Sequence, residues 1–137
     1  MKYRYLDHTS DLGMEIYGKT LRELFANGAY ALFDTITDLK AVASSEQREV
    51  RLKAAQLEDL FLDWLRELLF LFATEFFMAK EVTITGCSDR RIEAEVRGER
   101  FDPGRHRIKI EIKTPTYHMF KIEKSKTGYR AAVIFDV

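Results

Sequence analysis

Acidic side chains stand near both ends of this sequence, and carboxylates are the groups from which a cation site is most readily built. Near the start, the segment DHTSDLG places His8, Thr9 and Asp11 between two stretches typical of β-strands. Near the other end, Asp136 follows the apolar run AAVIF and directly precedes Val137. Carboxylates that are brought together either raise a pKa or recruit a cation, and oxygen ligands favour Ca²⁺ or Mg²⁺ over zinc.

The spacing alone does not say whether Asp11 and Asp136 meet. The ends of single domains often lie close together, which makes a shared cation site a hypothesis. His106 and His118 both stand near turns, and we expect both to be structural. The three scattered histidines and the distant Cys87 show no zinc-site spacing.

Basic residues gather in the segment RHRIKIEIK, which ends at Lys113. Two interpretations stay open for Lys113 and its neighbour Lys109: a solvated strand face, or a basic contact for a phosphate group or for an acidic protein surface. Likewise, Asp59, Asp63 and Glu67 share one helix ridge at i, i+4 spacing, and a solvated face is the simpler interpretation.

The composition describes a soluble globular protein. The 137 residues suit one domain, and 22 Lys and Arg balance 22 Asp and Glu, so a stand-alone nucleic-acid binder is disfavoured. A single cysteine gives no internal disulfide, and the first residues lack the apolar region of a signal peptide. The longest apolar-rich run carries six charges, which argues against a membrane span. We therefore expect a cytoplasmic protein.

Hydrophobic periodicity predicts an α+β fold of largely antiparallel sheet, about seven strands and two α-helices, in a single domain over residues 1–137. Thr20 and Glu23 have the spacing of a capping box, so the first helix is expected to begin at Leu21. The second helix is expected over 57–72, with a wide apolar stripe. The expected strands are 2–6, 12–17, 48–54, 81–86, 91–99, a long alternating stretch at 108–124, and 129–137.

Several of these segments, in this order, resemble the archease family. The matching stretches are DHTSDLGMEIYG, LRELFANGAYALFD, LEDLFLDWLRELLFLF, RGERFDPGRHRIKIEIKTPTYH and the closing VIFDV, which together span nearly the whole chain. One departure is Pro115, where the family more often has a small or β-branched residue. Proline cannot donate to a strand ladder, so this strand is expected at a sheet edge or a bulge.

The resemblance implies an accessory protein that is not itself an enzyme. Archeases activate the RtcB-type RNA ligase, which joins tRNA halves, by promoting its guanylylation from GTP with a divalent metal and by supporting repeated turnover. The family's metal-binding positions fall on Asp11, Asp136 and Val137, the last through a main-chain or terminal oxygen. The expected cation is Ca²⁺, with Mg²⁺ or Mn²⁺ as alternatives. The family's sensitive lysine falls on Lys113, and His8, Thr9, His106 and His118 match motif residues without an assigned role.

Other functions compete with ligase activation. An older proposal for the family is a chaperone-like modulator of a tRNA methyltransferase. A small metal-dependent hydrolase could use Asp11, Asp136 and a histidine, and a general protein-binding module would leave the carboxylates incidental. The expected partner is the RtcB-type ligase, with tRNA and GTP met only through it and with no membrane, while self-association is left open by the sequence.

Overall fold

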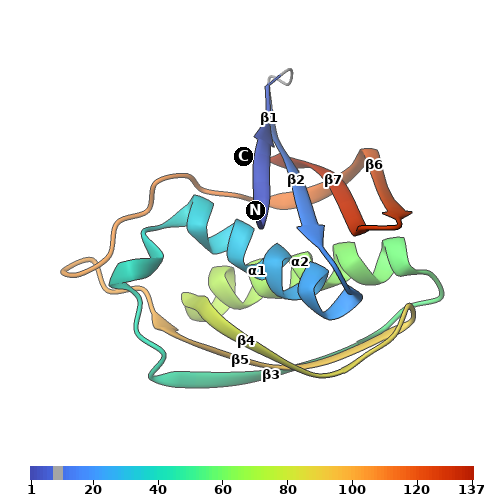
Figure 1. Cartoon of the computed structure of the whole chain (residues 1–137). Coiled ribbons are helices and arrows are strands. Elements are labelled where there is room, and N and C mark those ends of the chain that lie inside the picture. Colours follow the sequence, from blue (N-terminus) through green and yellow to red (C-terminus); the bar gives the residue numbers. More distant parts are fainter. Residues whose placement is uncertain (8–10) are drawn as a thin grey trace.

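Two α-helices lie between two antiparallel β-sheets in the computed structural model, which describes residues 1–7 and 11–137 (Figure 1). The helices are α1 (Leu21–Ile36) and α2 (Leu57–Glu75), and a short 3-10 helix, η1 (Leu39–Ala41), follows α1. The four-stranded sheet has the order β1 (Tyr3–Leu6), β2 (Leu12–Gly18), β7 (Gly128–Asp136) and β6 (Thr114–Ser125). The three-stranded sheet has the order β3 (Glu46–Lys53), β5 (Arg91–Arg100) and β4 (Phe77–Cys87).

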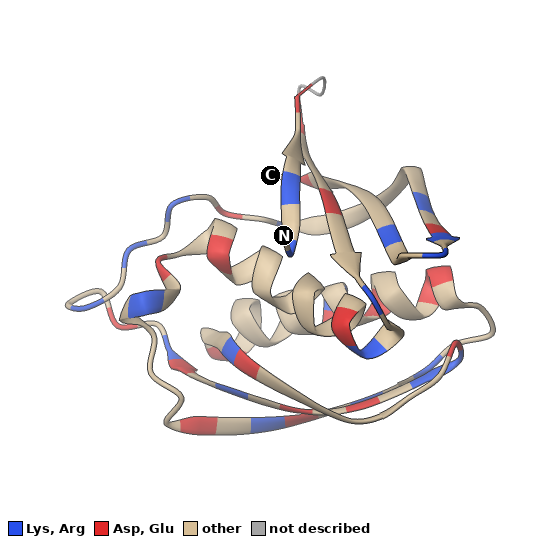
Figure 2. Cartoon of the chain, in the orientation of Figure 1, with Lys and Arg blue, Asp and Glu red and all other residues tan. Residues whose placement is uncertain are grey.

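The predicted α+β class is confirmed, since the described residues form seven antiparallel strands and two α-helices. The sequence did not predict the division into two sheets or the position of the helices between them. Figure 2 shows acidic and basic residues alternating along β3 and β5. The three-stranded sheet therefore carries charges of both signs along these strands, without the single-sign surface of a nucleic-acid binder. Within the described part of the chain, no helix has the length and apolar character needed to span a membrane.

Helices α1 and α2 pack closely against each other where they cross. The capping box is confirmed, because the hydroxyl of Thr20 accepts a hydrogen bond of 3.1 Å from the backbone N–H of Glu23. A Cβ atom at Gly28 of α1 would lie 3.1 Å from the ring of Phe61 in α2, so the missing side chain permits the close approach. The indole N–H of the fully buried Trp64 donates to the carbonyl of Phe25 at 2.8 Å.

Helix α2 is buried on more than one side. Its predicted apolar stripe is confirmed as core, and Leu62 and Leu69 outside that stripe are also buried. A helix that packs against a sheet on each side needs apolar residues around most of its circumference. The position of α2 in the middle layer therefore explains why its sequence is so rich in Leu and Phe.

The prediction of one continuous strand over 108–124 is wrong in its first part. Residues 109–113 form no strand, and Ile108 makes only an isolated bridge with Thr37. The N–H of Lys109 donates to the carbonyl of Ile36 at 2.7 Å, at the end of α1. This segment passes from one sheet to the other, so its alternating pattern finds no neighbouring strand along its length. Ile110 is consequently 39% exposed, although the pattern placed it on a buried face.

The expectation for Pro115 is confirmed on both counts. β6 is an edge strand of the four-stranded sheet, and its register with β7 shifts between Thr116 and Lys121. Pro115 itself stands opposite Phe135 of β7 and is buried. An edge strand leaves one side of its backbone without a ladder partner, so a missing N–H is tolerated there.

A buried carboxylate anchors the start of the segment that crosses between the sheets. Glu99 accepts hydrogen bonds from the guanidinium of Arg105, from the N–H of Ala43 at 2.6 Å and from Nε2 of His106 at 3.1 Å. The Nδ1 atom of His106 accepts from the N–H of Asp102 at 2.9 Å, which places the ring proton on Nε2. His106 is buried and satisfied, so its predicted structural role is confirmed.

Glu99 should make stability depend on pH. Arg105 foremost, with the Ala43 N–H, lowers the pKa of Glu99 from 4.5 to about 2. Because the folded state favours the carboxylate, its contribution is present above pH 4.5 and is lost as the pH falls towards 2. Near neutral pH, Glu99→Gln should lower the free energy of unfolding by about 1–3 kcal/mol.

Urea unfolding at a series of pH values measures this effect, with Glu81→Gln in the exposed part of β4 as the control. The difference between wild type and Glu99→Gln should shrink as the pH falls through this window. A difference that stays constant down to pH 2 would contradict the assignment.

Candidate functional site

The register of β2 and β7 brings the two acidic ends of the sequence together. Leu12 stands opposite Phe135 in this antiparallel pair. Continuing the register by one residue sets Asp11 opposite Asp136. Directly opposed residues on one face of an antiparallel pair have Cβ atoms about 4.5–5.5 Å apart, which is close enough for two carboxylates to share one cation. Both residues are exposed, so the end of the sheet where β2 begins and β7 ends is accessible to solvent.

Lys113 and Val137 lie beside these carboxylates. The N–H of Lys113 donates to the carbonyl of Asp136 at 2.9 Å, and the next residue, Thr114, stands opposite Asp136 in the register of β6 and β7. Val137 follows Asp136 directly and is 51% exposed. Four residues selected from the sequence therefore lie together where β2 begins and β7 ends: Asp11, Lys113, Asp136 and Val137.

The donor set at this end of the sheet fits a hard cation in an open site rather than a closed structural cage. In residues 1–7 and 11–137, no three His, Cys, Asp or Glu side chains come together in a way that could hold a metal ion. Two carboxylates and main-chain oxygens of Asp136 and Val137 are suitable ligands for Ca²⁺ or Mg²⁺. Because Ca²⁺ takes 6–8 oxygens, water or another macromolecule would have to supply the rest.

Among the described residues, His118 does not lie beside the carboxylates. His8 and Thr9 lie outside the described residues. His118 is exposed in the bulge of β6, and its expected structural role stays a prediction. His118 follows Thr116, which stands opposite Ile134, so the ladder places it beyond the residue pair that contains Asp136.

Two other basic residues of the crossing segment, Arg105 and Lys109, have structural partners. Arg105 pairs with Glu99 and Asp102, and the ammonium of Lys109 donates to the carbonyl of Asp34 at 2.7 Å. The continuous basic strand face that the sequence suggested is therefore absent, and Lys113 is the member of that group that lies beside the carboxylates. No sequence pattern predicts this division, because it depends on where the segment crosses between the sheets.

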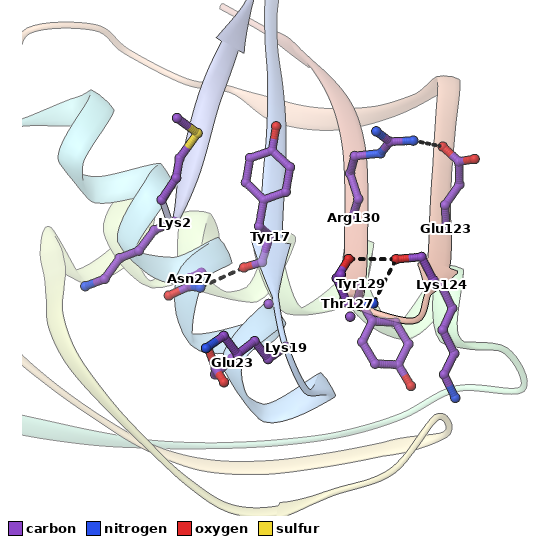
Figure 3. Close-up of a pocket in the computed structure, with 14 residues that line it drawn as sticks. Lys2, Tyr17, Lys19, Glu23, Asn27, Glu123, Lys124, Thr127, Tyr129 and Arg130 are labelled. Atoms are coloured by element: carbon purple, nitrogen blue, oxygen red, sulfur yellow. Dashed lines mark hydrogen bonds and ion pairs between the residues drawn. The ribbon is translucent and has the colours of Figure 1, made fainter.

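A separate cavity of about 550 Å³ opens at the opposite end of the four-stranded sheet (Figure 3). Its polar groups largely satisfy one another. Arg130 pairs with Glu123 at 2.9 Å, and the amide of Asn27 donates to the carbonyl of Tyr17 at 2.7 Å. The cavity adjoins the last residues of β2 and the first of β7, about 20 Å along the strands from the carboxylates. It takes no part in the candidate cation site.

Comparisons with known proteins agree on one family. The model of the Archease protein family matches residues 3–137. Protein archease of Archaeoglobus fulgidus is 40% identical over 139 residues, which are 100% of both chains. Protein archease of Methanosarcina barkeri is 37% identical over 140 residues, covering 99% of this chain and 96% of the relative.

Solved structures show the same fold. The solution structure of Methanobacterium thermoautotrophicum protein 1598 has a TM-score of 0.82 at 34% identity and covers 99% of each chain. A crystal structure from Thermotoga maritima, described as an archease and possible chaperone, has a TM-score of 0.68 at 20% identity over 96% of this chain and 94% of the other. By its sequence over nearly its full length, this chain belongs to the archease family.

Proposed function

We propose that this protein activates an RtcB-type RNA ligase by promoting the ligase's guanylylation. The observation that carries the proposal is the register of β2 and β7, which, continued by one residue beyond Leu12 and Phe135, sets Asp11 opposite Asp136 at the exposed end of the two strands. A cation held there would supply positive charge for phosphates or for a metal-dependent site on another macromolecule. The role of this chain's residues is to hold the cation, with the main-chain oxygen of Val137 as a further ligand.

The openness of the site favours an activator over an independent enzyme. Asp11, Asp136 and Lys113 are all exposed, whereas the reacting groups of an independent enzyme usually line a concave pocket that encloses the substrate. Lys113 stands beside the carboxylates and could contact a phosphate or an acidic group of the partner. The description of the Thermotoga maritima relative as a possible chaperone agrees with a protein that acts on another protein. A general chaperone or protein-binding module is the second candidate, and it predicts that the carboxylates are dispensable.

Guanylylation of a purified RtcB-type ligase tests the proposal under single-turnover conditions with GTP. Wild-type protein should accelerate the step, whereas Asp11→Asn and Asp136→Asn should remove most of the acceleration because each loses a cation ligand. Loss of a residue that only orients a metal ligand typically lowers metal affinity or activity by about 10- to 100-fold, so loss of a ligand should cost at least as much. Asp89→Asn, at an exposed turn between β4 and β5, is the matched control. An unchanged ligase rate with wild-type protein would reject the proposal.

Cation binding can be measured without the ligase. Ca²⁺ should raise the melting temperature of the wild-type protein, because a ligand that binds only the folded state stabilises it. The double variant Asp11→Asn/Asp136→Asn should show no such rise, while Asp89→Asn should respond like the wild type. Calorimetric titration with Ca²⁺, and separately with Mg²⁺ and Mn²⁺, identifies the preferred cation. An equal thermal shift in the double variant would place the cation elsewhere.

Lys113 should act on the partner and leave cation binding intact. Lys113→Met removes the ammonium but keeps the apolar stem, so the thermal shift with Ca²⁺ should persist. Acceleration of guanylylation should fall by about tenfold or more if a desolvated charge contact is lost. Lys53→Met, on an exposed edge of β3, is the control. Full acceleration by the Lys113 variant would assign this residue to a solvated face.

A further inference from the structure

An apolar groove runs along the second half of α2, next to the candidate cation site. It consists of two adjoining hollows of about 510 and 600 Å³, which share Leu69, Ala73 and Lys113. One wall is the helix, and the other is the segment Glu111–Thr114 that passes beside it. Lys113 lines both hollows and its N–H donates to the carbonyl of Asp136, so the groove lies beside the end of β7 that carries Asp136.

Large aromatic side chains stand exposed along this groove. Phe70 is 59% exposed and lines the first hollow, and Phe76 is 60% exposed and lines the second. Ala73 lies between them at three-residue spacing, so the three residues form one ridge of the helix and its end. Scattered apolar residues on a surface need no explanation, but neighbouring aromatic residues along a groove mark an interaction site.

The backbone at Phe76 is unfavourable for a large side chain. Phe76 has a φ of 59° in the left-handed region, where its N–H closes the end of α2 against the carbonyls of Leu71 and Phe72. Glycine is the usual residue at such a helix end. The position keeps an exposed phenylalanine where glycine would be more favourable for the isolated fold. Such local strain points to a role for the side chain outside the protein's own core.

The acidic ridge of α2 supplies a charge at one end of the groove. Asp59 accepts from the hydroxyl of Tyr117 at 2.7 Å, and Asp63 pairs with Arg66 at 3.1 Å. Glu67, the third member of the ridge, has no hydrogen-bond or ion-pair partner among the described residues, although it is half-buried and lines the first hollow. Burial raises the pKa of this carboxyl group, so a cationic partner would be favoured beside it.

We infer that this groove binds an apolar segment of the partner protein that carries a lysine or arginine. The apolar side chains of that segment pack against Phe70 and Phe76, and its basic group pairs with Glu67. The inference rests on the proposed function, in which the partner is the RtcB-type ligase. Docking beside Lys113 would bring the partner's surface to the carboxylates and so explains why the groove and the cation site adjoin.

The test measures the affinity of the purified RtcB-type ligase for immobilised wild-type protein and variants. Phe76→Gly and Phe70→Ser should each weaken binding by about tenfold or more, as expected for aromatic anchors of an interface. Glu67→Gln should weaken binding severalfold and reduce its dependence on salt concentration. Glu49→Gln, on the exposed face of β3, is the matched control and should bind like the wild type.

Phe76→Gly separates a docking role from a structural role. Glycine suits the left-handed conformation, so the melting temperature of this variant should stay the same or rise by about 2–5 °C while affinity falls. Loss of binding together with a large loss of thermal stability would assign Phe76 to the fold and would contradict the inference.

The result distinguishes failure of the inference from failure of the proposed function. Wild-type affinity in all three groove variants would overturn the inference even if guanylylation is stimulated. Weakened binding in these variants without any stimulation of guanylylation would support the groove and reject ligase activation. Absence of any binding to the ligase would overturn both. Light scattering measures the molar mass of the protein alone and completes the test. If the wild type is a dimer and Phe76→Gly is a monomer, the groove binds a second copy of this chain and the inference is overturned.

Discussion

The antiparallel pairing of β2 with β7 is the constraint on which the candidate site depends. Met14 and Ile16 of β2 and Val133 and Phe135 of β7 are fully buried. A slip of one residue would move every one of these side chains to the other face of its strand, so the core enforces the register. The same register, continued by one residue, sets Asp11 opposite Asp136. Hydrophobic packing that has no direct contact with a cation therefore positions the two carboxylates.

The layered architecture also explains why an apolar groove is left open on α2. A helix between two sheets needs apolar residues around most of its surface, and both sheets cover it over much of its length. Over its last turns, however, one neighbour is the irregular segment before β6 and not a strand. This segment covers the helix incompletely, so Phe70 and Phe76 stay exposed. The groove is thus a consequence of the crossing between the two sheets.

The sequence predicted those features that depend on local chemistry. The capping box at Thr20, the buried stripe of α2 and the edge position of Pro115 each follow from interactions within a few residues, and each is confirmed. The alternation over 108–113 was misleading, because a strand also needs a neighbouring strand, which no local pattern reports. The burial of Glu99 was missed for a similar reason, since its partner Ala43 lies far away in the sequence. The juxtaposition of Asp11 and Asp136 could be proposed from the family resemblance but not from spacing.

An open site with few ligands has a thermodynamic consequence for the proposed function. Two carboxylates and main-chain oxygens leave much of the coordination shell of Ca²⁺ to water, so the affinity of the isolated protein for the cation should be modest. If a docked partner supplies further ligands, the cation must strengthen docking by the same factor by which docking strengthens cation binding. The cation would then be held firmly only in the complex, at the place where the partner's phosphate chemistry occurs. A groove lined by Lys113, whose N–H binds the carbonyl of Asp136, places a docked partner close enough for such coupling.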